Sequence, residues 1–444
     1  MSELEIEIIK NAGVVGAGGA GFPTHIKLNT QIETLIINGA ECEPLINVDK
    51  QLLQFYFDKV YKGIKIVASV TKAKKIVLAL KEKHKEAVEA VESFTQQEIK
   101  FELFKLDNFY PAGDEQVLVY EVTGKIVPEG GIPLQVGVVV INVETLLNIY
   151  KATCGENVTD KYVTVNGGVK NPLTLMVPVG TPVKKLIDFC GGVTLEEYSC
   201  FDGGPMMGKL INEDTYAVKK TTKSVIVLPE DSVVVQNKKR DLSDVLKRAQ
   251  AICMSCRMCT DMCPRYLLGH DLFPDELMKR IFRGELSSED LEKYDCAYLC
   301  CDCGLCELYG CMMDLSARSL FNYIKSELER TGIKNSHNRS DLEVNEFREY
   351  RKVPVDRLEK RLEIDMYDSK TPLTDFSADV DKVKLYLSQH VGIPAEPVVK
   401  VGDSVKTGGL IADIPEGKLG AKIHSSISGK VKQLNSEYVL VGRS

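Results

Sequence analysis

The sequence lacks tryptophan altogether and contains only 6 histidines among 444 residues. It also lacks a basic excess, because 56 Lys and Arg residues face 63 Asp and Glu residues, for a formal net charge of −7. Proteins that bind nucleic acids usually present a strongly positive surface. We therefore expect no nucleic-acid partner.

Long hydrophobic runs are missing as well. The most apolar stretch, Val136 to Tyr150, is interrupted by Asn142 and Glu144 and is shorter than the roughly 20 apolar residues that a membrane helix needs. The first ten residues carry three glutamates and no apolar core, unlike a signal peptide. These absences predict a cytoplasmic protein without direct membrane insertion.

Cysteine is abundant, and its spacing is informative. Of 14 cysteines, eight form two runs in which three cysteines stand at two-residue gaps and a fourth follows. The first run is Cys253, Cys256, Cys259 and Cys263, and the second is Cys300, Cys303, Cys306 and Cys311. Such a triplet lets a tight loop wrap one face of an iron–sulfur cube, and eight thiolates match two [4Fe–4S] clusters.

The fourth cysteine of each run is expected to serve the other cluster, as in two-cluster ferredoxins. One cluster then takes Cys253, Cys256, Cys259 and Cys311, and the other takes Cys300, Cys303, Cys306 and Cys263. The second run departs from the usual pattern, because four residues precede its last cysteine and Met312 replaces the usual proline. The exchange of Cys263 and Cys311 therefore stays open, and Cys301, which breaks the spacing, is predicted not to be a ligand.

Two other uses of these cysteines fit less well. Zinc sites use pairs of ligands and not triplets at this spacing. Disulfides suit secreted proteins, whereas the six remaining cysteines are scattered as in a reducing cytoplasm.

A glycine-rich loop lies near the N-terminus, from Gly16 to Thr24. Dense glycines let backbone N–H groups approach a phosphate or a flat ring without obstruction by a Cβ atom. Gly16, Gly18 and Gly21 satisfy G-x-G-x-x-G, but a lone match is weak and Pro23 fits a Rossmann helix poorly. Taken alone, the loop could also be a flexible turn.

The sequence that follows favours an α/β layer fold. Short apolar strand patterns at 35–37, 75–80 and 136–140 alternate with helical stretches. Distinctive polar segments accompany them, namely Asn-Gly-Ala-Glu-Cys-Glu-Pro at 38–44, Tyr-Pro-Ala-Gly-Asp-Glu at 110–115 and Asn-Val-Glu-Thr at 142–145.

In this order, the glycine loop and these three segments resemble the flavin-binding domain of the NADH-oxidising subunit of respiratory complex I and the related subunit of the Rnf complex. The resemblance implies an FMN and NADH site built from these segments. The implied cofactor-binding residues are Gly16, Gly18, Gly19, Lys27, Asn38, Glu41, Glu43, Gly113, Asp114, Glu115, Asn142 and Thr145. No general acid or base is implied, so no catalytic residue is assigned.

Two further segments resemble known modules. Residues 162–210 resemble the small β-grasp (SLBB) domain, and 401–408 with 424–431 resemble the two halves of a biotinyl/lipoyl-type barrel-sandwich domain. We expect a multidomain α/β protein with a flavin domain (1–155), an SLBB domain (160–215), a helical two-[4Fe–4S] ferredoxin-like domain (240–330), a charged connector (331–380) and a C-terminal barrel-sandwich β domain (381–444).

The order of these parts resembles the PduS-type cobalamin reductases, since in the Rnf subunit the barrel-sandwich segment precedes the flavin domain. The resemblance implies that NADH reduces cobalamin through FMN and the clusters, for coenzyme B12 regeneration in propanediol utilisation. It also implies a cobalamin adenosyltransferase and microcompartment components as partners, and a location within a bacterial microcompartment.

The chemistry agrees with these parts, because NADH gives up two electrons as a hydride whereas a cluster or a cobalt centre accepts one, and a flavin mediates between them. No histidine lies in Asp-x-His-x-x-Gly, so the residues that bind a corrinoid are not identified. An Rnf-type electron-transport subunit and a non-catalytic electron-transfer adaptor remain as alternatives. The sequence leaves the oligomeric state open.

Overall fold

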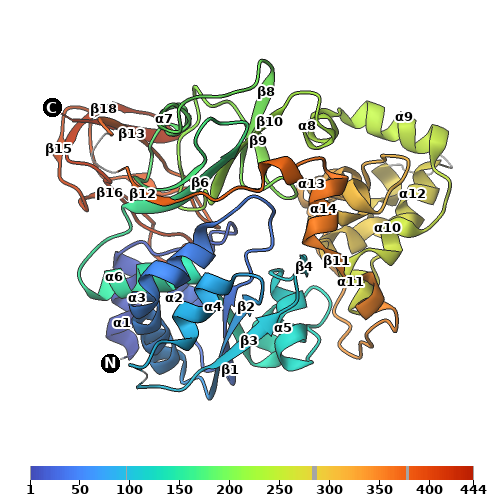
Figure 1. Ribbon diagram of the computed structural model, residues 1–444, viewed down its shortest axis with the longest axis horizontal. Helices are drawn as coiled ribbons and strands as arrows, with labels where there is room; N and C mark the ends of the chain where they lie inside the picture. Colours follow the sequence, from blue (N-terminus) through green and yellow to red (C-terminus); the bar gives the residue numbers. More distant parts are fainter. Residues whose placement is uncertain (1, 97, 283–287, 377–379, 444) are drawn as a thin grey trace.

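The computed structural model describes residues 2–96, 98–282, 288–376 and 380–443. Figure 1 shows an N-terminal unit in blue and cyan below a green β-grasp unit, with a helical unit in yellow and orange on the right and a red C-terminal unit on the left.

The N-terminal unit is built around a parallel sheet in the order β3-β2-β1-β5. Its elements are α1 (Ser2–Asn11), α2 (Thr24–Leu28), β1 (Thr34–Gly39), α3 (Val48–Thr71), β2 (Lys75–Lys81), α4 (Lys85–Glu92), β3 (Glu102–Leu106), β4 (Phe109–Tyr110), α5 (Glu115–Thr123), η1 (Pro133–Val136), β5 (Val138–Asn142) and α6 (Val143–Thr153). Helices α1, α3, α4 and α6 share one hydrophobic core with one face of the sheet, and α5 shares another with the opposite face. Because both faces are covered, β1 and β5 are apolar almost throughout.

The strand order reverses between β1 and β5. The chain leaves β1 through α3 and returns as β2 on one side, whereas β5 pairs with β1 on the other side. In open parallel sheets, ligands bind outside the carboxyl ends of the strands at such a switch point. The register pairs Asn38 with Asn142 at that end, so two predicted site residues mark the switch point.

The β-grasp unit contains β6 (Asp160–Gly167), β7 (Leu173–Pro178), α7 (Val183–Phe189), β8 (Tyr198–Asp202), β9 (Lys209–Ile211) and β10 (Ser224–Pro229). Its sheet has the order β12-β7-β6-β10-β8-β9. The sheet therefore extends beyond the expected boundary at 215, because β10 completes its centre. It also receives an edge strand, β12 (Leu373–Asp375), from far along the chain.

The helical unit comprises α8 (Val233–Lys239), α9 (Leu242–Ile252), α10 (Met258–Asp261), α11 (Pro264–Leu267), α12 (Pro274–Phe282), η2 (Ser288–Leu299), η3 (Leu305–Tyr309) and α13 (Ala317–Thr331). Cysteines of both runs contribute to its hydrophobic core, together with Leu320, Phe321 and Ile324 of α13.

The segment 331–380, expected to be an extended charged connector, is more structured than that. It contains η4 (Arg348–Arg351), β11 (Val353–Pro354), α14 (Val355–Arg361), η5 (Asp365–Tyr367) and β12. Leu358, Leu362 and Ile364 are buried in a core shared with Tyr110 and Cys303. These apolar residues are sparse among charged ones, which is why the composition suggested a solvated link. Residues 377–379 lie outside the described part.

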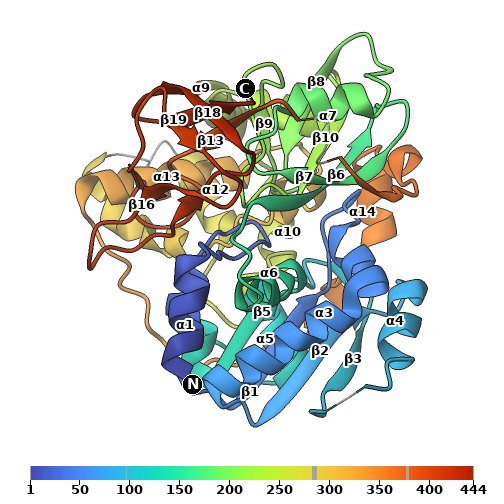
Figure 2. The same ribbon diagram turned by 90° about the vertical axis from the view of Figure 1, so that its left-hand side faces the viewer.

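The C-terminal unit contains β13 (Lys382–Tyr386), β14 (Glu396–Pro397), β15 (Ser404–Val405), β16 (Leu410–Asp413), β17 (Ile423–His424), β18 (Gly429–Leu434) and β19 (Tyr438–Gly442). They form two sheets, β13-β19-β18-β15 and β14-β16-β17, whose buried residues share a core with the β-grasp unit. Figure 2 shows this unit beside the β-grasp strands and above α1. Among the described helices, none combines the length and the apolar character that a bilayer crossing requires.

Candidate flavin and iron–sulfur sites

The glycine loop lies over the switch point of the sheet. The N–H of Ala17 donates to Oγ1 of Thr145 at 2.9 Å, which fixes the loop to the start of α6. A Cβ atom added at Gly18 would stand 3.4 Å from the Asn142 side chain, and one at Gly19 would meet nothing within 4 Å. Gly18 and Gly19 are exposed. The loop therefore presents bare backbone beside Asn142, as a bound phosphate or flavin ring requires.

Asn142 belongs to a polar network beneath the loop. Its Oδ1 accepts the N–H of Glu144 at 3.0 Å and caps α6, and its Nδ2 donates to Oδ2 of Asp49 at 2.8 Å. Asp49 also pairs with Lys223 of the β-grasp unit. Burial alone would lower the pKa of Lys223, but the neighbouring carboxylates, chiefly Asp49, raise it above its ordinary value, so this lysine is charged.

The segment 110–115 lines the same end of β1. Nδ2 of Asn38 donates to the carbonyl of Gly113 at 2.9 Å, and a Cβ atom at Gly113 would lie 3.1 Å from Sγ of Cys42. Asp114 caps α5 by accepting the N–H groups of residues 116 and 117, each at 3.1 Å. Glu115 pairs with Lys27 at 2.6 Å. The predicted residues of this segment thus lie together, between β1 and the helical unit.

The two predicted glutamates use their carboxylates for other contacts. Glu41 accepts the N–H of Asp49 at 2.7 Å and of Lys50 at 3.2 Å, at the start of α3. Glu43 accepts the N–H groups of Met206 at 3.1 Å and Met207 at 2.9 Å, in the Gly-Gly-Pro-Met-Met turn of the β-grasp unit. In this structure both side chains therefore hold the walls of the site, and the assignment of individual residues to FMN stays a prediction.

The two cysteine runs fold into equivalent loops. In the first, Ser255 and Arg257 have φ of 53° and 68°, and in the second, Asp302 and Gly304 have φ of 60° and 76°. Each pair occupies the third and fifth positions of its Cys-x-x-Cys-x-x-Cys triplet. Left-handed residues at alternate positions turn the backbone tightly, and in the second loop the N–H of Asp302 donates to Sγ of Cys300 at 3.4 Å. A repeated conformation of this kind supports a shared role for the two runs.

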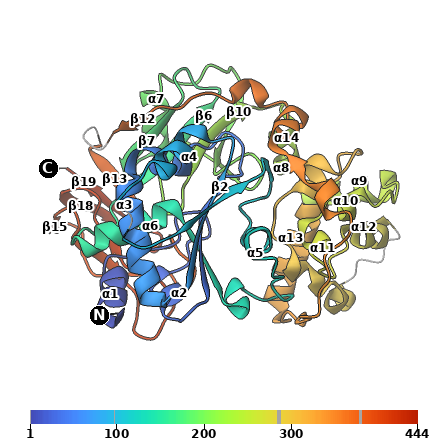
Figure 3. The same ribbon diagram turned by 60° about the horizontal axis from the view of Figure 1, so that its bottom comes forward.

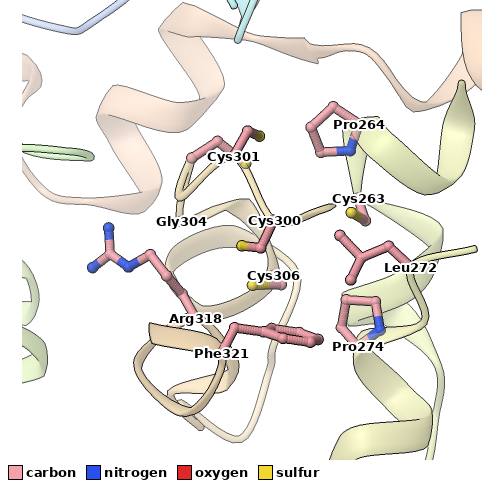
Figure 4. Close-up of a pocket in the computed structure, with 11 residues that line it drawn as sticks. Cys263, Pro264, Leu272, Pro274, Cys300, Cys301, Gly304, Cys306, Arg318 and Phe321 are labelled. Carbon is pink, nitrogen blue, oxygen red and sulfur yellow. The ribbon is translucent and has the colours of Figure 1, made fainter. Parts of the chain in front are cut away.

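The second run lines a cavity of about 320 Å³, counting the part that opens to solvent. Figure 4 shows Cys263 entering from α11 on one side and Cys300 and Cys306 from the loop on the other, with Leu272, Pro274 and Phe321 closing the space. Cys303 also lines it. Cys263, Cys303 and Cys306 are buried in largely apolar surroundings, which suit a cluster held by thiolates better than free thiols.

The fourth cysteines lie as the predicted exchange requires. Cys263 lines the cavity of the second run, and the Cys311 thiol interacts with that of Cys259 in the first. Within the described ranges, no three His, Cys, Asp or Glu side chains converge tightly enough to hold a single metal ion. Sulfurs around one zinc ion stand only about 3.8 Å apart, given Zn–S bonds of about 2.3 Å, whereas a four-iron cube holds its thiolates farther apart.

The flavin-type site and the second cysteine run touch directly. The hydroxyl of Tyr110 donates to the carbonyl of Cys303 at 2.8 Å. Arg265, next to Cys263-Pro264, donates to both carboxylate oxygens of Asp114 at 2.7 and 2.9 Å. Sequence analysis missed Arg265, and it missed Asp49 and Lys223 as well. Their partners lie more than a hundred residues away, and no local motif signals such pairs.

Four protein families match consecutive parts of the chain. Residues 9–151 match the Nuo51 FMN-binding domain, 162–210 the SLBB domain, 252–316 the 4Fe-4S dicluster domain and 367–443 the RnfC barrel sandwich hybrid domain. Together with the observed units, these matches confirm the predicted fold class.

Three curated proteins are similar to this chain. The cobalamin reductase PduS of Citrobacter freundii is 37% identical over 441 residues, and that of Salmonella typhimurium is 38% identical over 439 residues. Each alignment covers 98% of this chain and 96% of the relative. The RnfC-type component of the Na(+)-translocating ferredoxin:NAD(+) oxidoreductase complex of Acetobacterium woodii is 32% identical over 267 residues, which cover 59% of this chain and 58% of that relative.

Proposed function

The chain belongs to the family of the cobalamin reductase PduS, and we propose that it transfers electrons from NADH through FMN and two [4Fe–4S] clusters to cob(III)alamin and cob(II)alamin. It is a flavo-iron–sulfur oxidoreductase, with FMN and the two clusters as cofactors. The observation that carries the proposal is the meeting of the two sites at segment 110–115, where one side faces Asn38 and the other contacts Cys303 and Arg265.

The bound flavin would supply the change from two-electron to one-electron chemistry. For each NADH, the products are NAD⁺, a proton and two electrons, which reduce two cob(III)alamin to two cob(II)alamin. The chain's own residues position and shield these reactants. The glycine loop offers backbone N–H groups, the Asn142–Asp49–Lys223 network supplies a fixed polar wall, and the buried thiols hold the cluster away from water.

A direct test is anaerobic mixing of the reconstituted protein with NADH and cob(III)alamin, followed by absorbance. The proposal predicts that NADH is consumed as cob(II)alamin appears, in a ratio of one to two. Added FMN must be absent, because free flavin reduces cob(III)alamin directly. NADH oxidation by a dye without cobalamin reduction would instead indicate another acceptor.

We further propose that the activity supports coenzyme B12 regeneration for propanediol utilisation, with a cobalamin adenosyltransferase and microcompartment components as partners, in the cytoplasm and within a microcompartment. The names of the full-length relatives support the cobalamin role. An Rnf-type role is less favoured, because the Rnf relative aligns with 59% of this chain and the PduS relatives with 98%.

A further inference from the structure

The two cysteine sets differ in what surrounds them. In the second set, Cys263, Cys303 and Cys306 are buried and Cys300 is half-buried. In the first set, Cys256 is exposed, and Cys253, Cys259 and Cys311 are half-buried. Met254 and Met312, each next to a first-set cysteine, are 70% and 82% exposed. One set therefore lies inside the molecule and the other near its surface.

The buried set is also the one that contacts the flavin unit. Tyr110, only 1% exposed, reaches the carbonyl of Cys303, and the Arg265–Asp114 pair joins the residue two positions after Cys263 to the N-cap of α5. Figure 3 shows α5 between β2 and the helices of the helical unit. Gly113, between these two contacts, is held by Asn38 at the switch point. A continuous path of bonded residues therefore leads from the flavin-type site to the second run.

We propose that the cluster held by Cys263, Cys300, Cys303 and Cys306 is the one that exchanges electrons with the flavin, that Arg265 and Asp114 are positioning residues for this exchange, and that the cluster of the first set faces the external acceptor. This inference rests on the proposed function and adds an order to it. Electron tunnelling weakens steeply with distance, so the set that touches the flavin unit precedes the set near the surface. A bidentate pair between Arg and a carboxylate fixes both distance and orientation, which suits this role.

The test compares two variants that each retain one cluster, Cys303→Ser and Cys256→Ser, with iron content measured for both. Each protein is mixed rapidly with NADH when oxidised, and with NAD⁺ when reduced by dithionite. A cluster with a potential above that of the nicotinamide couple is reduced in the first mix, and one with a lower potential is oxidised in the second. The two mixes together therefore report on either cluster through its absorbance.

The proposal predicts that Cys256→Ser keeps the fast cluster phase of the wild type and that Cys303→Ser loses it, while NADH still reduces the flavin in both. The reverse result, or equal rates in the two variants, would overturn the order. Absence of cluster exchange in the wild type in both mixes would overturn the proposed function itself, so the two failures can be told apart.

A second pair of variants keeps all eight cysteines and guards against incomplete assembly. Arg265→Gln removes the bidentate contact with Asp114, whereas the matched control Arg257→Gln changes an arginine of the first loop that contacts Asp261 and Tyr266 within the helical unit. We expect Arg265→Gln to slow flavin–cluster exchange at unchanged iron content and unchanged flavin reduction, and Arg257→Gln to leave the exchange rate unchanged. Equal exchange rates in both variants would show that Arg265 is not a positioning residue.

Discussion

At the residue scale, Gly18 gives the most direct test of the flavin site. An added Cβ would stand at ordinary contact distance from Asn142, so the empty fold should accept alanine there. The added atoms would occupy the space that FMN needs. We expect Gly18→Ala to weaken FMN binding and Gly18→Val to abolish it, with the iron content unchanged. Flavin fluorescence after gel filtration would measure this, and full retention of FMN in Gly18→Val would show that the flavin binds elsewhere.

Buried charge at the same site gives a second residue-scale prediction. Glu144 and Lys161 form an ion pair whose side chains are 0% and 1% exposed, between α6 and β6. Removing one charge from a buried pair leaves the other uncompensated, so Glu144→Gln should cost about 3–5 kcal/mol of stability. Glu92→Gln, which breaks the exposed pair with Lys105, should cost about 0–1 kcal/mol. Urea unfolding of the two variants measures both effects, and similar costs would contradict the argument.

Residues that act through their neighbours in sequence could be predicted, and residues that act through distant contacts could not. The cysteine triplets and the glycine loop carry their geometry in local spacing, so both were found from the sequence. The Arg265–Asp114 contact spans 151 positions and depends on how two units pack. Glu41 and Glu43 show the same limit, because their motif was recognised while their partners, the N–H groups of α3 and of the Met206–Met207 turn, appear only in the fold.

At the scale of elements, the equivalent loops of the two cysteine runs predict two separable metal sites. The wild type should contain roughly eight iron and eight sulfide per chain after anaerobic reconstitution. Cys256→Ser and Cys303→Ser should each lose about half of that iron, since each run supplies three ligands of one cluster. Iron and sulfide analysis with electron paramagnetic resonance checks this. Zinc in place of iron, or full iron content in both variants, would contradict it.

Three units meet at Lys220, and this junction should respond to pH. Its Nζ donates to the carbonyls of Gly13 and Lys422, both at 2.7 Å, near the half-buried His390 and the buried His424. No carboxylate pairs with it in the part of the chain that the structure describes, and burial lowers its pKa to about 7. Between that value and the ordinary pKa of about 10.4, the unfolded state binds one proton more than the folded state, so stability rises with pH.

Lys220→Met removes this contribution. The melting temperature of the variant relative to the wild type should therefore be most favourable near pH 6–7 and fall as the pH rises toward 9. Because other titrating groups are common to both proteins, the difference between the two melting curves isolates Lys220. A difference that stays constant from pH 6 to pH 9 would show that the lysine is not buried at this junction.

At the scale of the whole molecule, the arrangement of units assigns them different tasks. The N-terminal unit and the helical unit hold the two kinds of redox site. The β-grasp unit supplies Lys223 to the polar network and the turn at Met206 that Glu43 binds. The C-terminal unit braces the glycine loop, since the N–H of Val391 donates to the carbonyl of Gly21 at 3.0 Å. The order of these units could be predicted from sequence, but their packing around segment 110–115 could not, because it depends on contacts between distant residues.

The most direct measurement of the central claim compares two anaerobic activities of Cys303→Ser with those of the wild type, without added FMN. One is NADH oxidation by a dye that takes electrons from the flavin, and the other is NADH-dependent reduction of cob(III)alamin. Loss of the cluster next to the flavin should spare the first and lower the second, and reduction onward to cob(I)alamin should fall at least as much. If Cys303→Ser reduces cobalamin at the wild-type rate, the clusters are not on the path from NADH to cobalamin, and the account is wrong.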